Sequence, residues 1–526
     1  MSLQDNKPAI AAVVQEGTAN KWLVLLSVMI GTFMSVLDAT IVSVAFPKMM
    51  AVFSVSVDQI EWVMTAYMLA FAVVLPSSGW IADRFGYKRT YIAGLFLFTL
   101  GSLACSFSWN ENILILFRIF QGAGAGFLMP VGMAIVTRVF PPKQRGVALG
   151  FWGIAAAASV SLGPMVGGYL VDNFSWHSIF DINVPIGILG VVAVMVIQDE
   201  YKSHVREKFD IAGFITMTIG LGTLLLAFAT GNSKWNTGGW TSPFILTNFF
   251  VAAVSLILFI IIEINIKQPI LNLRLLLNRN FGLSTLIMFI FGIAFFGNAF
   301  LLPIYVQNSL GYTAFQAGLL FFPVGILQAI VAPIAGQLTD RLNPKIPALI
   351  GITILGITMF LLSFLSLQTT KSQILFPLYL RGIGMGLVFT PLSTIALLNI
   401  PNQQLAQASG LFNTIRQVGG SFGIAALGTI LTQRVIFHTQ IYGEQLNPNS
   451  PLFGHVIENL KQYAIHAVGS SPVEAISQAK ILLLKNITSQ AFVQGISNDF
   501  YIGAVLTFIM IIPLFFLKTG KKSLNR

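Results

Sequence analysis

The segments "GWIADRFGYKR" (79–89) and "GQLTDRLNPK" (336–345) repeat the same charged pattern in two distant parts of the chain. At an offset of 257 residues, the matching pairs are Gly79 and Gly336, Asp83 and Asp340, Arg84 and Arg341, and Lys88 and Lys345. An offset of 260 residues relates the glycines at 122, 124 and 126 to those at 382, 384 and 386, and the residues at 141, 144, 148 and 150 to those at 401, 404, 408 and 410. Agreement at three separate places indicates an internal duplication.

The composition predicts an all-α protein that crosses a membrane many times. The 526 residues are 55% hydrophobic and 9% charged, and the mean hydropathy is +0.79, far from the balance of soluble domains. Cys105 is the single cysteine, so no internal disulfide and no cysteine metal cage are expected. The polar stretch 1–21 precedes an apolar run that is too long for a signal peptide, so we expect a retained first span.

Fourteen apolar stretches are long enough to cross a hydrocarbon core of about 30 Å. They lie near 22–46, 59–81, 88–107, 112–137, 145–170, 178–197, 211–229, 243–264, 281–305, 314–338, 346–366, 374–399, 405–433 and 498–517. An even number of spans places both termini on one side. If that side is the cytoplasm, 20 Lys and Arg residues face it, seven face the other side, and Arg118, Arg381 and Arg416 lie within helices. The positive-inside rule therefore puts both termini in the cytoplasm and explains the net charge of +11 without a nucleic-acid partner.

The repeat and the spans together predict the domain organisation. We expect a cytoplasmic tail (1–21), a six-helix bundle (22–200), two inserted helices with linkers (201–270), a second six-helix bundle (271–517) and a cytoplasmic tail (518–526). Glu263 lies near the cytoplasmic end of the second inserted helix, where we expect it to reach water. Parallel six-helix repeats are the plan of secondary transporters whose halves rock around a central site.

Five sequence motifs in the first half carry a family resemblance. They are "SVLDATIVSVAFP" (35–47), "GWIADRFGYKR" (79–89), "FRIFQGAGAGF" (117–127), "SVSLGPMVGGYL" (159–170) and "INVPIG" (182–187), and "RQVGGSFG" (416–423) follows in the second half. In this order they resemble the major facilitator superfamily (MFS), and within it the fourteen-helix drug:proton antiporters that include EmrB-like multidrug permeases. The resemblance implies the MFS fold, transport without an enzymatic reaction, and efflux from the inner (plasma) membrane of a bacterium.

The loop at 79–89 is the first candidate functional element. Glycine permits close helix approach, the carboxylate of Asp83 can accept from a helix N-terminus, and the basic residues keep the loop in water. The resemblance implies a latch between the halves that holds in the outward-open state; the latch residues would be Gly79, Asp83, Arg84, Gly86, Lys88 and Arg89. Anchoring by positive charge alone would explain Lys88 and Arg89, but neither Asp83 nor the second copy.

Asp38 and Arg118 are the candidate proton-coupling pair. A carboxylate inside a membrane helix costs about 2.5–3.5 kcal/mol on insertion scales unless it faces a cavity or a partner. Arg118 has a similar depth and cannot lose its charge, so it can modulate a nearby acid but cannot carry the proton. The resemblance implies that Asp38 is a proton or cationic-drug site. A permanently paired structural acid is the alternative.

Small residues around Pro164 form a further motif. Gly163, Gly167 and Gly168 have helix-packing spacing, and the proline removes a backbone hydrogen bond. The resemblance implies the signature of antiporters, although Ser159 stands where the family has glycine. Close packing without a role in transport is the alternative.

Other polar side chains in the oily helices are candidates for the substrate cavity. They are Tyr67, Gln121, Asn298, Tyr305, Gln307, Gln328, Tyr379, Arg381, Asn413, Arg416 and Gln417. For Arg381 and Arg416 the alternatives are bracing of the second bundle and contact with an anionic substrate. Asp181, at the outer mouth, could bind a cation, but an acid at the interface is more often merely solvated.

The only sizeable hydrophilic segment, 434–497, is expected outside the membrane. "SPVE" (471–474) has the pattern of an N-cap, a first-turn proline and a capping-box glutamate, and predicts a helix that runs toward the last span. The segment is compatible with binding of a periplasmic adaptor and an outer-membrane channel, or with a cap that packs on itself.

The sequence therefore predicts proton-coupled efflux of lipophilic, cationic or amphiphilic drugs by alternating access. The alternative within transport is a proton-coupled exporter of one physiological solute, such as a lipid, siderophore or metabolite. The motifs HExxH and Walker A are missing from the sequence, and the segment "GGSFG" (419–423), which matches GxSxG, lies inside a predicted membrane span. We therefore expect no enzyme activity, no metal and no cofactor, with a proton gradient as the energy source. A passive channel would leave the repeated latch unexplained.

Overall fold

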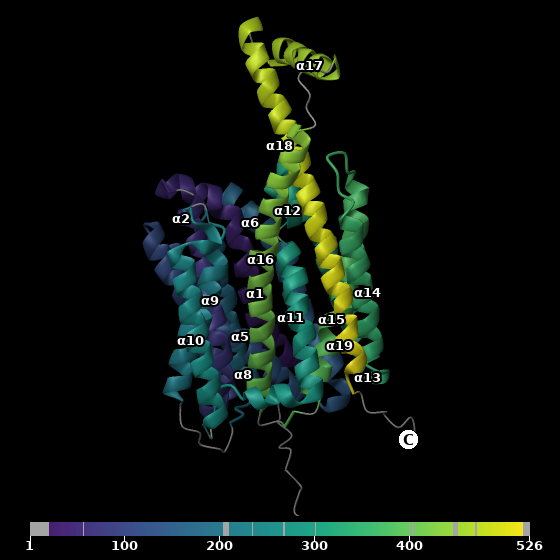
Figure 1. Cartoon of the computed structure of the whole chain (residues 1–526). Coiled ribbons are helices and arrows are strands. Elements are labelled where there is room, and N and C mark those ends of the chain that lie inside the picture. Colours follow the sequence, from purple (N-terminus) through teal and green to yellow (C-terminus); the bar gives the residue numbers. More distant parts are fainter. Residues whose placement is uncertain are drawn as a thin grey trace, which may run out of the picture.

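The computed structural model describes residues 20–55, 57–202, 210–233, 235–266, 269–299, 301–398, 400–401, 404–444, 451–468 and 471–518. Within these ranges the regular structure is helical (Figure 1). Most of the two predicted tails, residues 1–19 and 519–526, lies outside the described residues.

The helices of the first half correspond to the first six predicted spans. They are α1 (Lys21–Phe53), α2 (Val57–Val74), η1 (Leu75–Ser77), α3 (Ser78–Phe85), α4 (Tyr87–Ser106), α5 (Glu111–Val139), η2 (Pro142–Gln144), α6 (Arg145–Asn173), α7 (Ser178–Asp181) and α8 (Asn183–Ile197). Side chains define several of their ends. Asn20 caps α1 and Asn110 caps α5, each by accepting a hydrogen bond from a backbone N–H of the first turn.

The remaining helices contain the other eight predicted spans. They are α9 (Ile211–Thr230), η3 (Gly239–Thr241), α10 (Pro243–Asn265), η4 (Leu273–Leu277), α11 (Arg279–Ala299), α12 (Leu301–Asn308), α13 (Ala314–Arg341), α14 (Lys345–Leu362), α15 (Lys371–Leu397), α16 (Leu405–Glu444), α17 (Pro451–Val468), α18 (Pro472–Ile509) and α19 (Ile511–Phe516).

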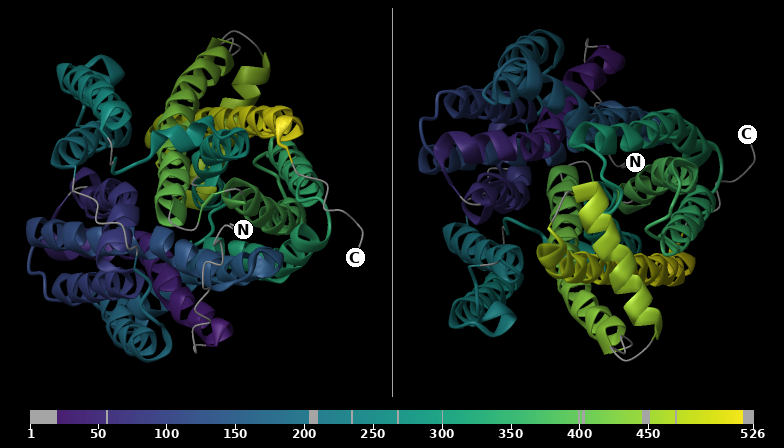
Figure 2. Two further views of the ribbon diagram at one scale, coloured as in Figure 1. Left: turned by 90° about the horizontal axis from the view of Figure 1, so that it is seen from below. Right: turned by 90° about the horizontal axis from the view of Figure 1, so that it is seen from above.

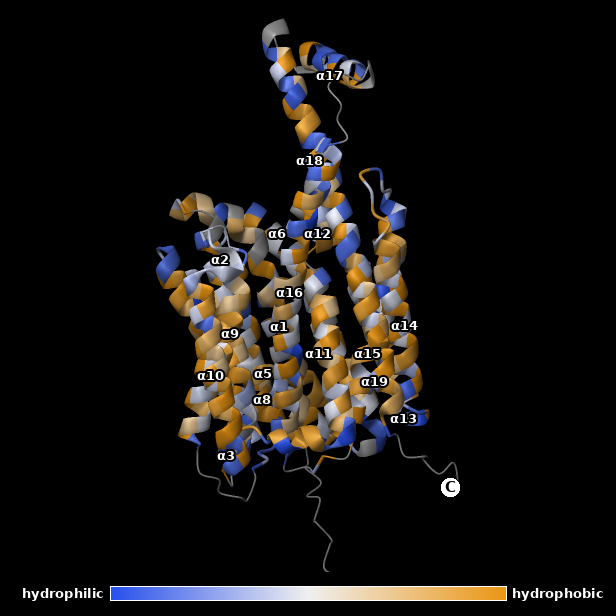
Figure 3. Ribbon diagram, viewed as in Figure 1, coloured by the Kyte–Doolittle hydropathy of each residue, from blue (hydrophilic) through white to orange (hydrophobic). Residues whose placement is uncertain are grey.

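The predicted fold class is confirmed. In the described residues, 13 helices are long and apolar enough to cross a membrane, and α6 occupies the remaining predicted span and packs along α1 and α13. Figure 3 shows that apolar residues dominate the outside of the bundle, as lipid contact requires. The described chain starts and finishes on the same face of the bundle, opposite α17 (Figure 1). We call this the cytoplasmic face, following the charge distribution.

The inserted helices α9 and α10 pack against each other beside both halves (Figure 2). α9 contacts α2 of the first half and α16 of the second. Near the outer face, Asn232 Nδ2 donates to Thr429 Oγ1 at 3.0 Å, and Trp240 Nε1 donates to the same oxygen at 2.7 Å. The inserted pair is therefore fastened to α16. The expectation that Glu263 reaches water is wrong, because this residue is only 2% exposed and Leu271 N–H donates to its carboxylate.

The two halves meet at the cytoplasmic face through closely packed backbones. A Cβ on Gly336 of α13 would lie 2.3 Å from the carbonyl oxygen of Gly146 on α6, and a Cβ on Gly150 would lie 2.5 Å from that of Ala332. α16 contacts α3, η1 and α5 in the same region. Only glycine permits so short a distance between backbones, so these positions define how tightly the halves close.

In the described residues, the hydrophilic segment forms a helical stalk. α16 has 40 residues and α18 has 38, whereas about 20 residues cross a membrane. Both helices project beyond the bundle, and α17 lies near their outer ends (Figure 1). The predicted helix start at Ser471 is confirmed: its side chain and that of Glu474 form a capping box. Hereafter "stalk" means α17 and the outer parts of α16 and α18 within residues 434–497.

Replacing Gly336 by alanine should separate the cytoplasmic ends of α6 and α13, because its Cβ would overlap the backbone of Gly146. Spin labels at Lys143 and Asn343, both exposed at these ends, should report longer distances in Gly336→Ala than in the parent protein. Gly443→Ala is the matched control, since a Cβ there meets nothing within 4 Å. Equal label distances in both variants would show that this contact does not set the closure.

Candidate functional site

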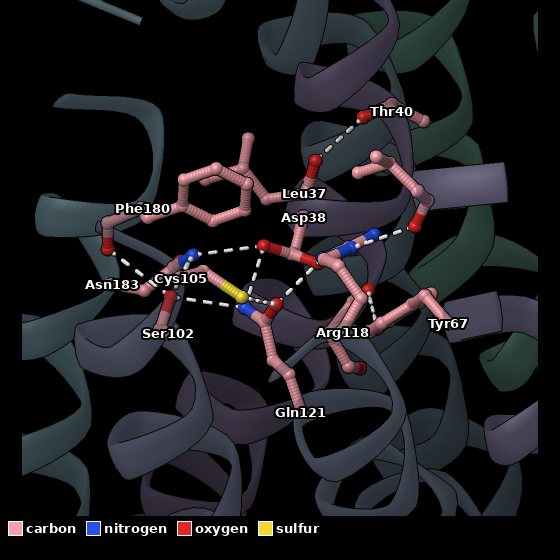
Figure 4. Close-up of polar contacts among 12 residues, drawn as sticks. Leu37, Asp38, Thr40, Tyr67, Ser102, Cys105, Arg118, Gln121, Phe180 and Asn183 are labelled. Carbon is pink, nitrogen blue, oxygen red and sulfur yellow. Dashed lines mark hydrogen bonds and ion pairs between the residues drawn. The ribbon is translucent and has the colours of Figure 1, made fainter. Parts of the chain in front are cut away.

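Asp38 lies at the centre of a polar cluster inside the first half. It projects from α1 and is met by side chains from α5 and α8, which Ser102 of α4 joins (Figure 4). Asp38 and Arg118 are both 0% exposed, and Arg118 Nη1 donates to Asp38 Oδ2. The structure therefore brings together the two residues that the sequence predicts as a pair.

Neutral amides hold the second oxygen of the carboxylate. Gln121 Nε2 donates to Asp38 Oδ1 at 2.8 Å, and Asn183 Nδ2 donates to the same atom at 3.1 Å. Both amides also donate to Ser102 Oγ, at 2.9 and 3.1 Å. The hydroxyl of Ser102 in turn donates to the carbonyl oxygen of Phe180 at 3.1 Å. The carboxylate is thus coordinated by a chain of groups from four helices.

Arg118 is positioned by α2 as well as by Asp38. Its Nε donates to the carbonyl oxygen of Val63 at 3.1 Å, and its guanidinium carbon lies 4.1 Å from the centre of the Tyr67 ring. Tyr67 is fixed in turn, because its hydroxyl donates to the carbonyl oxygen of Ser35 at 2.9 Å. Arg118 Nη2 has no hydrogen-bond partner in the described residues, so one donor remains free.

Burial makes this pair energetically important. Removing one partner of a buried ion pair typically costs about 3–5 kcal/mol, because an uncompensated charge is left in a medium of low dielectric. The same low dielectric makes the pair sensitive to any movement of α1 relative to α5. The cluster is therefore suited to coupling a protonation event to helix movement.

Ser102 and Asn183 complete the cluster, although they are not among the predicted site residues. Asn183 lies in the quoted motif "INVPIG", and both residues are polar positions in otherwise apolar spans. That signal is weak, because many such serines only donate to their own helix, as Ser393 does to the carbonyl oxygen of Phe389. Their role emerges only when four helices are assembled.

The first copy of the repeated loop is bound to the end of its own half. Tyr87 hydroxyl donates to Asp83 Oδ1 at 2.7 Å, and the backbone N–H groups of Lys88 and Arg89 donate to the Glu200 carboxylate at 3.1 and 3.2 Å. Gly86 has a φ of +105°, and a Cβ there would lie 2.2 Å from Glu200 Oε1. Gly79 is buried and Arg84 is partly buried on α3, which packs against α16.

The second copy contacts the opposite half directly. Gly146 N–H donates to Asp340 Oδ1 at 3.2 Å and Val147 N–H donates to Oδ2 at 3.1 Å. These N–H groups belong to the first turn of α6, where free donors and the helix dipole favour an anion. Asp340 therefore caps a helix of the other half. Sequence reasoning assigned this kind of contact to Asp83 and named Asp340 only as its counterpart.

The glycines of the predicted antiporter motif face α1, whereas the proline faces the other half. A Cβ on Gly163 would lie 2.1 Å from Thr40 Oγ1, and one on Gly167 would lie 2.7 Å from Ile41 Cγ1. Pro164 packs against Gly318 of α13, and Gly168 is buried. The hydroxyl of Ser159 donates to the carbonyl oxygen of Phe33 at 2.8 Å, so it also joins α6 to α1.

The predicted cavity residues do not form one group. Tyr67 and Gln121 belong to the Asp38 cluster, Asn298, Tyr305 and Asn413 are buried in the second half, and Gln307, Gln328 and Gln417 are partly buried. Tyr379 is 40% exposed and lines an apolar groove of about 450 Å³, with Pro323, Ile326, Leu327 and Ile383. Asp181 is exposed to solvent.

Arg381 and Arg416 are cations without a carboxylate partner in the described residues. Arg381 is 3% exposed, with its guanidinium 4.6 Å from the centre of the Phe295 ring. Arg416 is partly buried, 5.4 Å from the Phe389 ring, and its Nη2 lies 3.7 Å from Met129 Sδ. A cation–π contact contributes about 0.5–2 kcal/mol, which is less than the several kcal/mol lost when a charge is buried. Ring contacts alone do not balance these charges.

Within the described residues, no group of three or more His, Cys, Asp or Glu side chains could hold a metal ion. The chemistry of the site is therefore that of one carboxylate, three membrane-embedded guanidiniums and neutral hydrogen-bonding groups. Such a set can exchange protons and bind charged or polar groups.

Comparison with known proteins agrees with this architecture. The chain is 31% identical to the multidrug export protein EmrB of Haemophilus influenzae, over 94% of this chain and 95% of the relative. It is 30% identical to the fatty acid resistance protein FarB of Neisseria gonorrhoeae, over 95% and 96% of the two chains. Among solved structures, the human organic anion transporter MFSD10 superposes with a TM-score of 0.61 at 12% identity, covering 95% of this chain and 99% of that one, and shows a shared fold.

The family model of the Major Facilitator Superfamily matches residues 28–424, which include the Asp38 cluster, both copies of the loop and both unpaired arginines. The fold and the extent of this match agree with the helix arrangement described above. The chain is a transporter that belongs to the Major Facilitator Superfamily.

Proposed function

We propose that this transporter exports lipophilic, cationic or amphiphilic drugs across the bacterial inner membrane in exchange for protons. The observation that carries the proposal is the fully buried Asp38 carboxylate, which is held by Arg118 and by neutral amides from other helices. Asp38 is the one acidic side chain of this cluster, whereas Arg118 keeps its charge. No nucleotide or other cofactor is needed, because the proton gradient supplies the energy.

Protonation of Asp38 would alter several contacts at once. A neutral carboxyl group no longer forms an ion pair with Arg118, which keeps its charge. The guanidinium then keeps its contacts with Val63, Gln121 and the Tyr67 ring. Because these partners lie on α2 and α5, loss of the α1 contact favours movement of α1 relative to its neighbours. Export would follow if this movement accompanied rocking of the two halves.

The latch role of the repeated loop is part of the proposal. In the structure the halves are in contact at the cytoplasmic face, with Asp340 capping α6 and α3 packed on α16. Opening toward the cytoplasm must break the bonds from Gly146 and Val147 to Asp340. Residues 79–89 of the first copy would support the equivalent contact with the second half. Glu200 holds their conformation by accepting hydrogen bonds from their backbone.

The stalk supports a proposed partner. Its helices project beyond the bundle and carry exposed apolar residues, among them Ile436, Tyr463, Ile481 and Leu484. A periplasmic adaptor that leads to an outer-membrane channel would fit this position. The two EmrB and FarB relatives extend over nearly the same length as this chain, so the stalk region lies within the compared segment.

Asp38→Asn should abolish drug export driven by a proton gradient, because the amide cannot carry the proton. Export of ethidium from proteoliposomes or cells, with and without a protonophore, measures this. The variant also leaves Arg118 uncompensated, so its thermal stability should fall by an amount comparable to the loss of a buried ion pair, about 3–5 kcal/mol.

Asp181→Asn is the matched control, since it changes an exposed acid of the same half. It should export at the parental rate. Drug binding to Asp38→Asn, measured at equilibrium without a gradient, separates lost coupling from lost folding. Gradient-driven export by a folded Asp38→Asn protein would place the coupling site elsewhere. A panel of unrelated drugs distinguishes multidrug efflux from export of one physiological solute, which predicts no response to the panel.

Asp340→Asn should weaken closure of the cytoplasmic face. An amide keeps one acceptor oxygen but loses the charge that favours a helix N-terminus, a change worth about 0.3–2 kcal/mol. The distance distribution between labels at Lys143 and Asn343 should shift toward separated ends, and turnover should slow while drug affinity changes little. Asp172→Asn, on the outer part of α6, serves as the control. A tenfold loss of drug affinity with unchanged distances would assign Asp340 to substrate binding.

A further inference from the structure

The second half holds two arginines at mid-membrane depth that have no carboxylate partner in the described residues. Arg381 lies ten residues beyond the outer start of α15, and Arg416 lies 11 residues beyond the cytoplasmic start of α16. At about 1.5 Å per residue, both lie roughly halfway through a core of about 30 Å. From residue 264 to residue 443 the only acidic residue is Asp340, which is committed to the N-terminus of α6.

The donor atoms of these arginines are available. Arg381 Nε and Nη1, and Arg416 Nε, have no hydrogen-bond partner in the described part of the chain. Each guanidinium faces a phenylalanine ring: Arg381 faces Phe295, and Arg416 faces Phe389. The contact between Arg416 and Met129 reaches α5 of the first half, so this charge lies where the two halves meet. A guanidinium stays ionised under all ordinary conditions, so the two charges persist.

The internal duplication sharpens the contrast between the halves. At the offset of 260 residues set by the glycine triplets, Arg381 corresponds to Gln121. In the first half, neutral Gln121 supports a carboxylate and its paired arginine, and the cluster is neutral in sum. In the second half, the equivalent position carries a cation, and the helix that corresponds to α1 contains no acid between 279 and 308. The first half therefore pairs its buried arginine with a carboxylate, whereas Arg381 and Arg416 have no carboxylate partner in the described residues. The second half also has a buried acid, Asp499 on α18, but it is not within ion-pair distance of either arginine.

We propose that Arg381 and Arg416 bind the anionic head group of an amphiphilic substrate, such as a carboxylate with an apolar tail. The inference rests on the proposed efflux function and narrows its substrate class from lipophilic, cationic or amphiphilic drugs to amphiphilic anions. The head group would supply the missing counter-charge and accept hydrogen bonds from the free guanidinium donors. Phe295, Phe321, Phe389 and Met129 would offer apolar contacts to the tail.

Equilibrium binding to the full-length protein in phosphatidylcholine nanodiscs tests this assignment. The probes are octanoate and octyltrimethylammonium, which share a tail and differ in the charge of the head, with empty nanodiscs subtracted for partitioning into lipid. Octanoate should bind at least tenfold more tightly than octyltrimethylammonium. Arg381→Gln and Arg416→Gln should each weaken octanoate binding about ten- to hundredfold, as expected for loss of a charged hydrogen-bond donor, and leave the cation unaffected.

Arg434→Gln is the matched control. Arg434 lies on α16 like Arg416 and its guanidinium is 5.8 Å from the Phe437 ring, but it is exposed in the stalk region. Its replacement should leave octanoate binding unchanged. Arg381→Lys keeps the charge and loses the forked donor geometry, so its affinity for octanoate should be intermediate. Thermal unfolding of each variant shows whether it is folded. The comparison of octanoate with octyltrimethylammonium in the parent protein tests the proposal even if a variant does not fold.

Two results would overturn the assignment: tighter or equal binding of octyltrimethylammonium by the parent protein, or parental octanoate affinity in the folded Arg381→Gln/Arg416→Gln protein. Failure of the efflux proposal would look different. Proteoliposomes with a pH gradient would then move neither probe, although the binding preference could still be present. Transport of the cation alone would retain proton-driven efflux and reject the anion site.

Discussion

The structure depends on one ion pair that is withdrawn from water within the first half. Asp38 or Arg118 without the other would cost several kcal/mol in this buried site. Gln121, Asn183 and the Tyr67 ring stabilise the pair further through hydrogen bonds and a cation–π contact. The pair therefore constrains the helices around it. α1, α2, α4, α5 and α8 must keep the spacing that these contacts require, and any change in charge at Asp38 acts on that spacing.

Duplication has produced two halves with different electrostatics on one plan. The first half balances its buried charges internally, whereas Arg381 and Arg416 of the second half lack a carboxylate within ion-pair distance in the described residues. In the repeated loop, Glu200 binds the backbone of the first copy, and Asp340 of the second copy accepts from the backbone of α6. A shared fold with divided tasks is consistent with a transporter that handles protons and solutes at separate places.

Much of this organisation can be predicted from the sequence because membrane spans and repeats have strong signals. Hydropathy locates the spans, and the depth of Asp38 and Arg118 along their helices is enough to pair them. The partners Ser102, Asn183 and Glu200 are harder to predict, since they become neighbours only when separate helices pack. Glu263 was misjudged for a related reason, because proximity to a span end does not reveal that Leu271 covers the acid. The helix start at Ser471 was predictable from its capping box, whereas the extension of α16 beyond its span had no comparable signal.

The continuity of α16 has a mechanical consequence. This single helix of about 60 Å begins at the cytoplasmic closure, passes Arg416 at mid-membrane and ends in the stalk. It can therefore act as a lever whose two arms share one fulcrum inside the bilayer. A small tilt of α16 about its middle displaces its outer end by several ångströms. A force on the outer end is likewise transmitted to the contact at the cytoplasmic face. A partner bound to the outer end of α16 would therefore be coupled to the opening and closing of the cytoplasmic face.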